Sequence, residues 1–414
     1  MEIIKDKINQ IPITYVNVDK FKSVSGVLFF KMPIKKEMFV TRTLIRNILI
    51  HSCNKYPSNR LLNINCLENF DAYYSSGFRR EGNYAINYFI FRCLDEKYSE
   101  KNVINNVIDT FYEIIFNPNV VDGKFNEEEY SLATQRLRSY LESEKENATS
   151  YAENMLCKQM GYDTAISFKP EIEILNKVTN ESLYKEYLNM INNSEVEFMV
   201  AGNKVSDISF DKLFLNLKAK KYDKKLKIQT EIPDSFNKKI EEYNGLQSIL
   251  TVGLKLKDLS DYESTYVLPV YNNILGGGAS ARLFDTVREK NSLAYSCFSR
   301  YEKDDNMIEI ISGIEAENYE KTLGLIIKVV NSMKRVTDDE VKRSITEITS
   351  SLKESQDDLY NYILPIYASK LYNEKDIKTK IKEIQKVTKE DVEKLFDKIH
   401  VTDSFFFKGG KTSE

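Results

Sequence analysis

Residues 275–298 read LGGGASARLFDTVREKNSLAYSCF, a stretch in which three consecutive glycines precede an apolar pattern with helical spacing and a short strand-like run. Gly276, Gly277 and Gly278 have no Cβ atom. The backbone there can therefore adopt positive φ, or another segment can approach it closely. We expect a loop, a helix and then a strand, in this order.

The expected helix begins directly after the glycines. Ser280 can accept a hydrogen bond from the free N–H groups of the first turn. Leu283, Phe284 and Val287 follow at spacings of three and four residues, which places them on one buried helical face. Arg288 then ends this helix.

A tyrosine stands seven positions after Arg288, in the apolar run Leu293-Ala294-Tyr295. If the chain doubles back into a strand here, the Tyr295 hydroxyl lies beside the Arg288 guanidinium. A fixed cation next to a phenol donor suits the binding of a peptide carbonyl, or of the oxyanion that forms from it. The same residues also fit a helix C-terminal arginine, favoured by the helix dipole, and a core tyrosine. Spacing alone does not separate these two readings.

The passage resembles the second-domain signature of the pitrilysin/insulinase-type peptidases, a family that includes the mitochondrial processing peptidase. That signature reads Leu-Gly-Gly-Gly-x-Ser-Ser-Arg-Leu-Phe, then Arg-Glu, then Gly-Leu-Ala-Tyr-Ser. This chain departs from it at Ala281 and Ser292 and keeps both Arg288 and Tyr295. The resemblance implies that the Arg/Tyr pair holds a substrate carbonyl near a zinc ion of the first domain or of a partner subunit. It also implies a substrate-binding loop, made of Gly276, Gly277, Gly278, Ser280 and Arg282.

Length and composition limit the possible functions. A chain of 414 residues with 42% hydrophobic content exceeds the size that one core usually serves, so we expect two domains. The net charge is -3, and the 59 basic and 62 acidic residues are interspersed, which argues against a nucleic-acid or membrane partner. We see no signal peptide and no stretch that would span a bilayer, so we expect a cytoplasmic protein. The five scattered cysteines are typical of reduced thiols.

The second half of the chain repeats the first. The phrase KVTNESLYKEY at 177–187 recurs as KVTKEDVEKLF at 386–396, and each is followed by an apolar strand pattern that ends in glycine. The pattern of a helix, an acidic turn and a long helix within 102–151 recurs within 318–360. Three matches in the same order indicate a duplication.

We expect an N-terminal peptidase-like domain at 1–218, a charged linker at 219–239 and a C-terminal peptidase-like domain at 240–414. The patterns alone indicate units of strands and helices in mixed order. The resemblance adds a fold class, α+β, with two homologous domains that each consist of a largely antiparallel sheet with helices packed on it. In the first half we expect two strands within 14–34 with a break at 23–26, helices at 41–50, 60–69, 101–116 and 126–146, a hairpin through Gly82-Asn83 and a buried strand at 196–203.

Active members of this family carry an inverted zinc motif, His-x-x-Glu-His, on an early helix, where two histidines bind one ion and the glutamate acts as general base. A Lys-Tyr-Pro-Ser turn at 55–58 resembles the family's continuation and places Thr43, Arg46 and Asn47 at the motif positions. Threonine and asparagine are poor zinc ligands beside imidazole, and Arg46 puts a permanent cation where a dication would bind. We therefore expect no metal in this chain and zinc in a partner subunit.

With the zinc positions replaced and the Arg/Tyr pair kept, the chain resembles the non-catalytic subunit of a heterodimeric pitrilysin-type peptidase, which implies a catalytically incomplete subunit of a heterodimeric zinc peptidase. Its partner is then a zinc-bearing pitrilysin-type subunit, and its substrate is a peptide, with leader-peptide removal as one role that the sequence does not separate from others. A second hypothesis is a scaffold or peptide-binding subunit that only stabilises its partner, as core subunits of this fold do in respiratory complexes. Replacing Arg288 or Tyr295 distinguishes the two, because only the first hypothesis predicts a loss of peptide cleavage.

Overall fold

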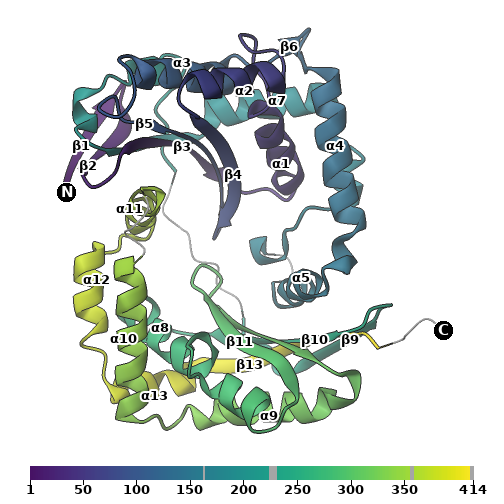
Figure 1. Ribbon diagram of the computed structural model, residues 1–414. Coiled ribbons are helices and arrows are strands. Elements are labelled where there is room, and N and C mark those ends of the chain that lie inside the picture. The colour runs from purple at the N-terminus through teal and green to yellow at the C-terminus, as the bar shows by residue number, and fades with distance from the viewer. Residues whose placement is uncertain (162–163, 223–230, 355–358, 411–414) are drawn as a thin grey trace. The chain divides into compact units, whose positions relative to one another are not determined.

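The computed structural model describes residues 1–161, 164–222, 231–354 and 359–410 (Figure 1). The chain forms two compact units. Unit 1 consists of Met1–Glu142, Lys169–Lys225 and Gln356–Leu371, and unit 2 of Ser143–Phe168, Leu226–Ser355 and Tyr372–Glu414. Residues 223–230, which belong to the linker expected at 219–239, lie outside the described residues.

The sheet of unit 1 has the strand order β1-β2-β8-β3-β5-β4, in which only β2 and β8 are parallel neighbours. Its strands are β1 (Glu2–Ile8), β2 (Ile11–Asn17), β3 (Ser23–Pro33), β4 (Tyr73–Glu81), β5 (Tyr84–Leu94) and β8 (Glu195–Gly202). Gly82 adopts a φ of 54° between β4 and β5, so the hairpin predicted through Gly82-Asn83 is confirmed. Nearly all of β3 is buried, because it lies in the middle of the sheet.

Helices pack on this sheet and form the core of unit 1 with it. They are α1 (Met38–Leu49), α2 (Asn59–Glu68), α3 (Val103–Phe116), α4 (Glu127–Glu142), α6 (Ile172–Leu175), α7 (Asn180–Asn193) and most of α11 (Tyr360–Tyr372). The small hairpin β6 (Val120–Val121) and β7 (Lys124–Phe125) precedes α4. The apolar stripe predicted for α3 is buried as expected.

The sheet of unit 2 has the strand order β11-β12-β10-β13-β9, and again only its last pair, β13 and β9, is parallel. Its strands are β9 (Asn237–Glu242), β10 (Ser248–Leu256), β11 (Ala294–Glu302), β12 (Met307–Ile314) and β13 (Ile399–Lys408). This order repeats β4-β5-β3-β8-β2 of unit 1 strand for strand. The duplication that the repeated phrases indicated is therefore visible in the topology.

The helices of unit 2 are α5 (Ala148–Met160), α8 (Leu268–Asn272), α9 (Tyr319–Ser332), α10 (Asp338–Glu354), α12 (Ile377–Ile384) and α13 (Lys389–Lys394). The segment between β10 and β11 contains π-helical turns at η5 (Glu263–Val267), directly before α8, at η6 (Asn273–Gly277), directly after it, and at η7 (Phe284–Glu289). The repeated phrase begins α7 in unit 1 and α13 in unit 2, and Thr179 and Thr388 form capping boxes at these two starts.

The fold class predicted from the sequence, α+β with two homologous, largely antiparallel sheets covered by helices, is confirmed. Two local predictions were wrong. The break expected at 23–26 falls inside β3, because the chain turns earlier, between Asn17 and Ser23. The helix expected to reach Glu146 ends at Glu142 and continues as a separate 3₁₀ turn.

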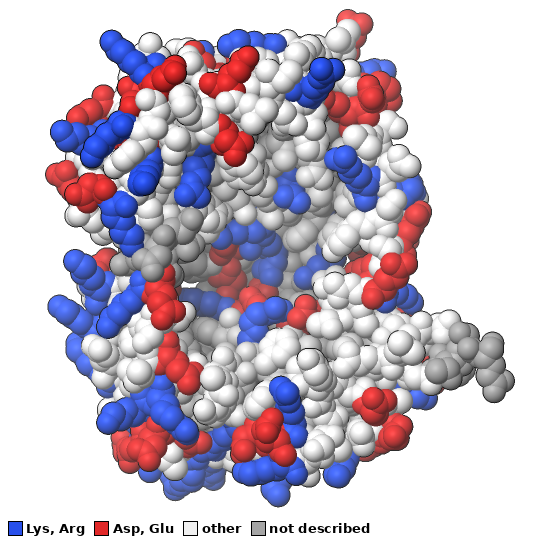
Figure 2. All heavy atoms as spheres, in the orientation of Figure 1, with Lys and Arg blue, Asp and Glu red and all other residues white. Residues whose placement is uncertain are grey.

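Acidic and basic side chains are interspersed over the face seen in Figure 2. This mixture was expected, because the two kinds of residue are nearly equal in number and mixed along the sequence. None of the helices in the described ranges is long and apolar enough to cross a membrane.

Candidate functional site

The three glycines are required by close approach and not by positive φ. None of Gly276, Gly277 and Gly278 has a left-handed backbone conformation. A Cβ atom on Gly276 would lie 2.6 Å from the backbone nitrogen of Ser299, and one on Gly278 would lie 2.6 Å from Oδ1 of Asn273. Gly276 thus lets η6 pack directly on β11, which fixes where the following segment enters the site.

The helix predicted after the glycines is π-helical in its main part. The N–H of Lys290 donates to the carbonyl of Asp285, five residues back, at 2.9 Å. The helix begins at Arg282, and among the described residues no N–H group of its first turn donates to the Ser280 hydroxyl, so the cap expected from Ser280 was wrong. Leu283 and Val287 are fully buried, as predicted. π-helical turns are rare and occur frequently at functional sites.

All N–H groups of the Arg282 guanidinium donate hydrogen bonds to groups within unit 2. Its guanidinium forms two hydrogen bonds to the Glu340 carboxylate, at 2.7 and 2.8 Å. The remaining N–H groups donate to the carbonyl and hydroxyl of Ser332 and to the carbonyl of Arg335. The hydrogen bonds from Arg282 lower the pKa of Glu340 to about 2, and the backbone and hydroxyl of Thr337 contribute in the same direction. An arginine with all five donors used has none left for a substrate.

Tyr295 lies at an irregularity of β11. Ala294 pairs with Ile314 and Ser296 with Gly313, so Tyr295 is the extra residue of a β-bulge. Bulges are common next to active sites, because they turn a side chain away from the regular ladder. The Tyr295 side chain is 79% exposed, which excludes the alternative of a core tyrosine.

Arg288 lies between two aromatic rings. Its Cζ atom is 4.7 Å from the centre of the Phe284 ring and 5.6 Å from the centre of the Tyr295 ring. The chain thus doubles back as the sequence predicted, but the guanidinium faces the tyrosine ring. Stacking on two rings restricts the guanidinium without using its N–H groups.

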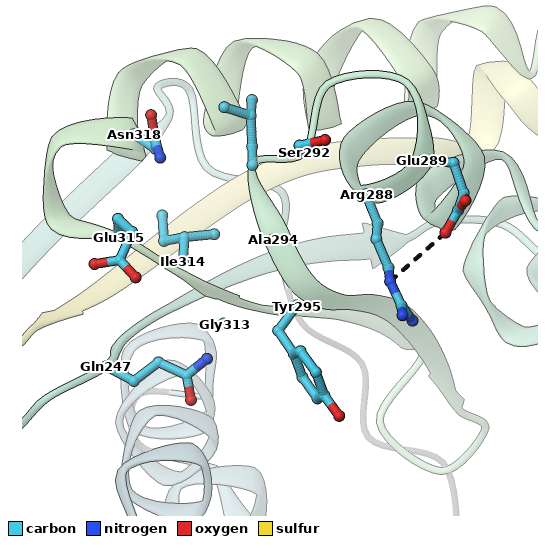
Figure 3. Close-up of a pocket in the computed structure, with 11 residues that line it drawn as sticks. Gln247, Arg288, Glu289, Ser292, Ala294, Tyr295, Gly313, Ile314, Glu315 and Asn318 are labelled. Atoms are coloured by element: carbon cyan, nitrogen blue, oxygen red, sulfur yellow. Dashed lines mark ion pairs between the residues drawn. The ribbon is translucent and has the colours of Figure 1, made fainter.

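Both side chains line a cavity of about 460 Å³ at this end of the sheet (Figure 3). Figure 3 shows Arg288 and Tyr295 extending from the ribbon in the same direction. The cavity is lined by Gln247, Arg288, Glu289, Ser292, Leu293, Ala294, Tyr295, Gly313, Ile314, Glu315 and Asn318. The glycines at 276–278, Ser280 and Arg282 are not among these residues.

The donors of Arg288 and Tyr295 are available to a ligand. Within the described part of the chain, Arg288 has one charged neighbour, Glu289, with 3.6 Å between Nε and Oε1. That distance is too long for a hydrogen bond. No hydrogen bond of the Tyr295 hydroxyl occurs among the described residues. A guanidinium and a phenol with unused donors at one cavity can bind a carbonyl oxygen, or an oxygen on which negative charge develops.

The three positions of the zinc motif lie on α1 of unit 1, and they do not fit a metal ion. The Thr43 hydroxyl donates to the carbonyl of Phe39 at 2.7 Å. Nη1 of Arg46 donates to the carbonyl of Ser76 at 3.2 Å, and the Ser76 hydroxyl donates back to the carbonyl of Arg46 at 3.1 Å. Burial lowers the pKa of Arg46. Arg46 thus clamps β4 to α1 with a cation, and Asn47 alone is no metal site.

His51, one turn after Asn47, offers no alternative ligand set. Its Nε2 atom lies 3.3 Å from Nη1 of Arg136, and burial together with this arginine lowers the pKa of His51. Across the described ranges there is no group of three or more His, Cys, Asp or Glu side chains that could hold a metal ion.

Residues 177–348 match the family model described as Peptidase M16 inactive domain. The chain is 24% identical to the "Probable inactive metalloprotease YmfF" of Bacillus subtilis, over 98% of this chain and 97% of that protein. The chain is similar to inactive M16 peptidases. The resemblance to this family that the sequence indicated is thereby confirmed.

Solved structures agree on the fold of the M16-like chain. A conserved protein from Enterococcus faecalis matches with a TM-score of 0.91 and 20% identity, over 100% of both chains. The peptidase M16 inactive domain from Pseudomonas fluorescens matches with a TM-score of 0.80 and 17% identity, also over 100% of both chains.

Sequence reasoning missed most of the cavity around the Arg/Tyr pair. Phe284 had been assigned to the buried face, although its spacing of four residues from Arg288 places both on one side of a helix. Gln247, Glu315 and Asn318 carry no local signal, because they reach the cavity from segments distant in sequence.

Proposed function

We propose that this M16-like chain is the catalytically incomplete subunit of a heterodimeric zinc peptidase. Arg288 and Tyr295 contribute the part of the active site that binds the carbonyl oxygen of the substrate peptide. One observation carries the proposal. Within the described ranges, both side chains keep unused donors at one cavity, while the residues at the zinc-motif positions do not fit a metal.

In this proposal the partner subunit supplies the zinc ion, and this chain supplies hydrogen bonds. Arg288 and Tyr295 donate to the substrate oxygen, and their donation strengthens as negative charge builds on that oxygen during hydrolysis. The two aromatic contacts of Arg288 hold the guanidinium in place, so little reorganisation is required. Loss of one such donor typically lowers kcat by about 10²–10³-fold.

The edge strand β11 gives a reason for binding an extended peptide. β11 is the last strand of its sheet, and unpaired backbone groups of edge strands pair readily with added strands. Asn272 donates to the carbonyl of Ser299 at 3.4 Å, and η6 approaches the same residue, so this part of the edge is covered. The end near Tyr295 is then the part that meets the peptide.

The test is reconstitution with a zinc-bearing M16-type partner. We expect no peptide cleavage by this chain alone, cleavage by the mixture, and a loss of about 10²-fold or more in kcat with Arg288→Ala. Lys290→Gln is the matched control, because Lys290 is an exposed cation two residues away that pairs with Asp285 and does not line the cavity.

Size-exclusion chromatography of each mixture establishes that the complex forms. Unchanged turnover by an intact complex with Arg288→Ala contradicts the proposal and favours a scaffold subunit that only stabilises its partner. Cleavage by this chain alone contradicts it as well.

A further inference from the structure

A second cavity in unit 2 lies between helix α5 and the edge strand β9, both of which belong to that unit. Its volume is about 390 Å³. It is lined by Met155, Lys158, Gln159, Asn237, Lys238 and Lys239. None of these residues belongs to the Arg288 and Tyr295 cavity, so the second cavity is independent of the proposed function.

Specific contacts hold α5 beside β9. The Gln159 amide donates to the carbonyl of Asn237 at 3.1 Å and to the carboxylate of Asp403 at 3.0 Å. The Tyr151 ring packs against Phe407 with 4.5 Å between ring centres. The two walls of the cavity are therefore fixed relative to each other within unit 2.

The lining of this cavity is positively charged, and the carboxylate nearest to Lys239 along the strand, Glu241, lies outside it. Three of its six lining residues are lysines, and no carboxylate lines it. In the ranges that the structure describes, Lys158 and Lys239 form no ion pair, while Lys238 has a long contact of 3.6 Å with Glu320. The adjacent Glu241 is occupied, because its carboxylate accepts from Lys145 at 2.7 Å and from the Tyr151 hydroxyl at 2.8 Å.

Lysines on edge strands also have a purely protective role, since they prevent strands of other molecules from pairing there. That role accounts for Lys238 and Lys239. It does not account for Lys158, which lies on α5 and lines the same cavity. Cations from two elements thus converge on one recess, with Met155 as its apolar side chain.

We propose that this recess binds an acidic peptide segment. Carboxylates of the segment pair with Lys158 and Lys239, and its backbone pairs with the outer edge of β9, to which no described strand is bonded. A peptide fits better than a nucleic acid, because an extended chain matches a strand edge.

The experiment measures binding to the full chain by fluorescence anisotropy. The probe is a short fluorescein-labelled peptide in which Glu and Val alternate, and the comparison peptide has Gln in place of Glu. We expect the acidic peptide to bind at least about tenfold more tightly, and to weaken between about 0.05 M and 0.3 M salt. Equal binding of the two peptides, or no binding of either, overturns the proposal.

Variants then locate the site. Lys158→Gln with Lys239→Gln is expected to weaken the acidic peptide by about tenfold, whereas Lys158→Arg with Lys239→Arg retains it. Lys321→Gln with Lys328→Gln on α9 is the matched control, because these lysines are exposed and do not line the cavity. A loss equal to that of the control overturns the assignment. Tighter binding of a labelled oligonucleotide through the same lysines overturns the peptide as ligand.

Discussion

Replacing Glu340 by Gln removes the charge that anchors Arg282, and we expect this single change to destabilise unit 2 at neutral pH. The guanidinium of Arg282 joins the helical turn before η7 to the start of α10, through two hydrogen bonds to Glu340. The Glu340 side chain is 17% exposed, so solvent screens the pair only in part. Glutamine keeps the shape of the side chain and loses its charge.

The size of the effect follows from the pKa of Glu340, which Arg282 lowers from 4.5 to about 2. This pKa difference corresponds to about 3 kcal/mol of interaction energy. After partial screening by solvent, we expect it to contribute about 2–3 kcal/mol to the free energy of unfolding. Because the folded-state pKa is depressed, this stability is fully present above pH 4.5. It is lost as the pH falls from 4.5 towards 2.

Differential scanning calorimetry as a function of pH measures the effect. At pH 7 we expect Glu340→Gln to lower the Tm of the transition of unit 2 by roughly 5–10 °C. The difference from the unmodified chain should shrink steadily below pH 4.5. Glu383→Gln is the control, because Glu383 on α12 pairs with Lys386, an exposed lysine just after that helix, and such surface pairs contribute little. Equal effects of the two substitutions at pH 7, or a difference independent of pH, would refute the reasoning.

Three further predictions concern other parts of the fold. Gly276→Ala should lower the free energy of unfolding by about 2 kcal/mol or more, because the new Cβ would lie 2.6 Å from the Ser299 nitrogen. Gly324→Ala on α9 should instead raise this free energy by about 0.5–1 kcal/mol, because no atom lies within 4 Å of the new Cβ. Denaturant titration measures both changes. Burial, and next the charge of Glu153, raise the pKa of Glu309 to about 7, so its stabilising contribution is present below pH 4.5 and lost as the pH rises through 7. Glu309→Gln should therefore raise the Tm at pH 8 and leave it unchanged at pH 4; a lower Tm at pH 8 would count against this. Metal analysis of the purified chain should find no stoichiometric zinc, and zinc that disappears on replacing Thr43, Arg46 or Asn47 would show that α1 binds the ion after all.

Much of the fold could be predicted because the sequence repeats itself. The KVT phrase marks two capped helix starts, and the same local interaction forms at Thr179 and at Thr388. Amphipathic helices such as α3 were also predicted, because burial of one face leaves a regular spacing. β1 was missed, since it is an exposed edge strand in which charged and apolar residues do not mark a buried face.

Contacts within the candidate site could be predicted only where its residues are close in sequence. Arg288 and Tyr295 are seven positions apart, and a turn into a strand was enough to bring them together. The family resemblance placed Arg282 in a substrate-binding loop, and its main partner, Glu340, gave no local signal because it is 58 positions away. The π-helical turn at η7 was missed for a different reason. Its apolar spacing also fits an α-helix, and the difference lies in which carbonyl each N–H selects.

The most direct test of the central claim is the turnover of a reconstituted heterodimer that carries Tyr295→Phe. This change removes one hydroxyl and leaves the ring that stacks on Arg288. Tyr262→Phe, a partly exposed tyrosine outside the cavity, is the control. We predict that kcat falls by about 10²-fold with Tyr295→Phe, while assembly and the control are unaffected. An unchanged kcat in a fully assembled complex would contradict the claim that this hydroxyl binds the substrate oxygen.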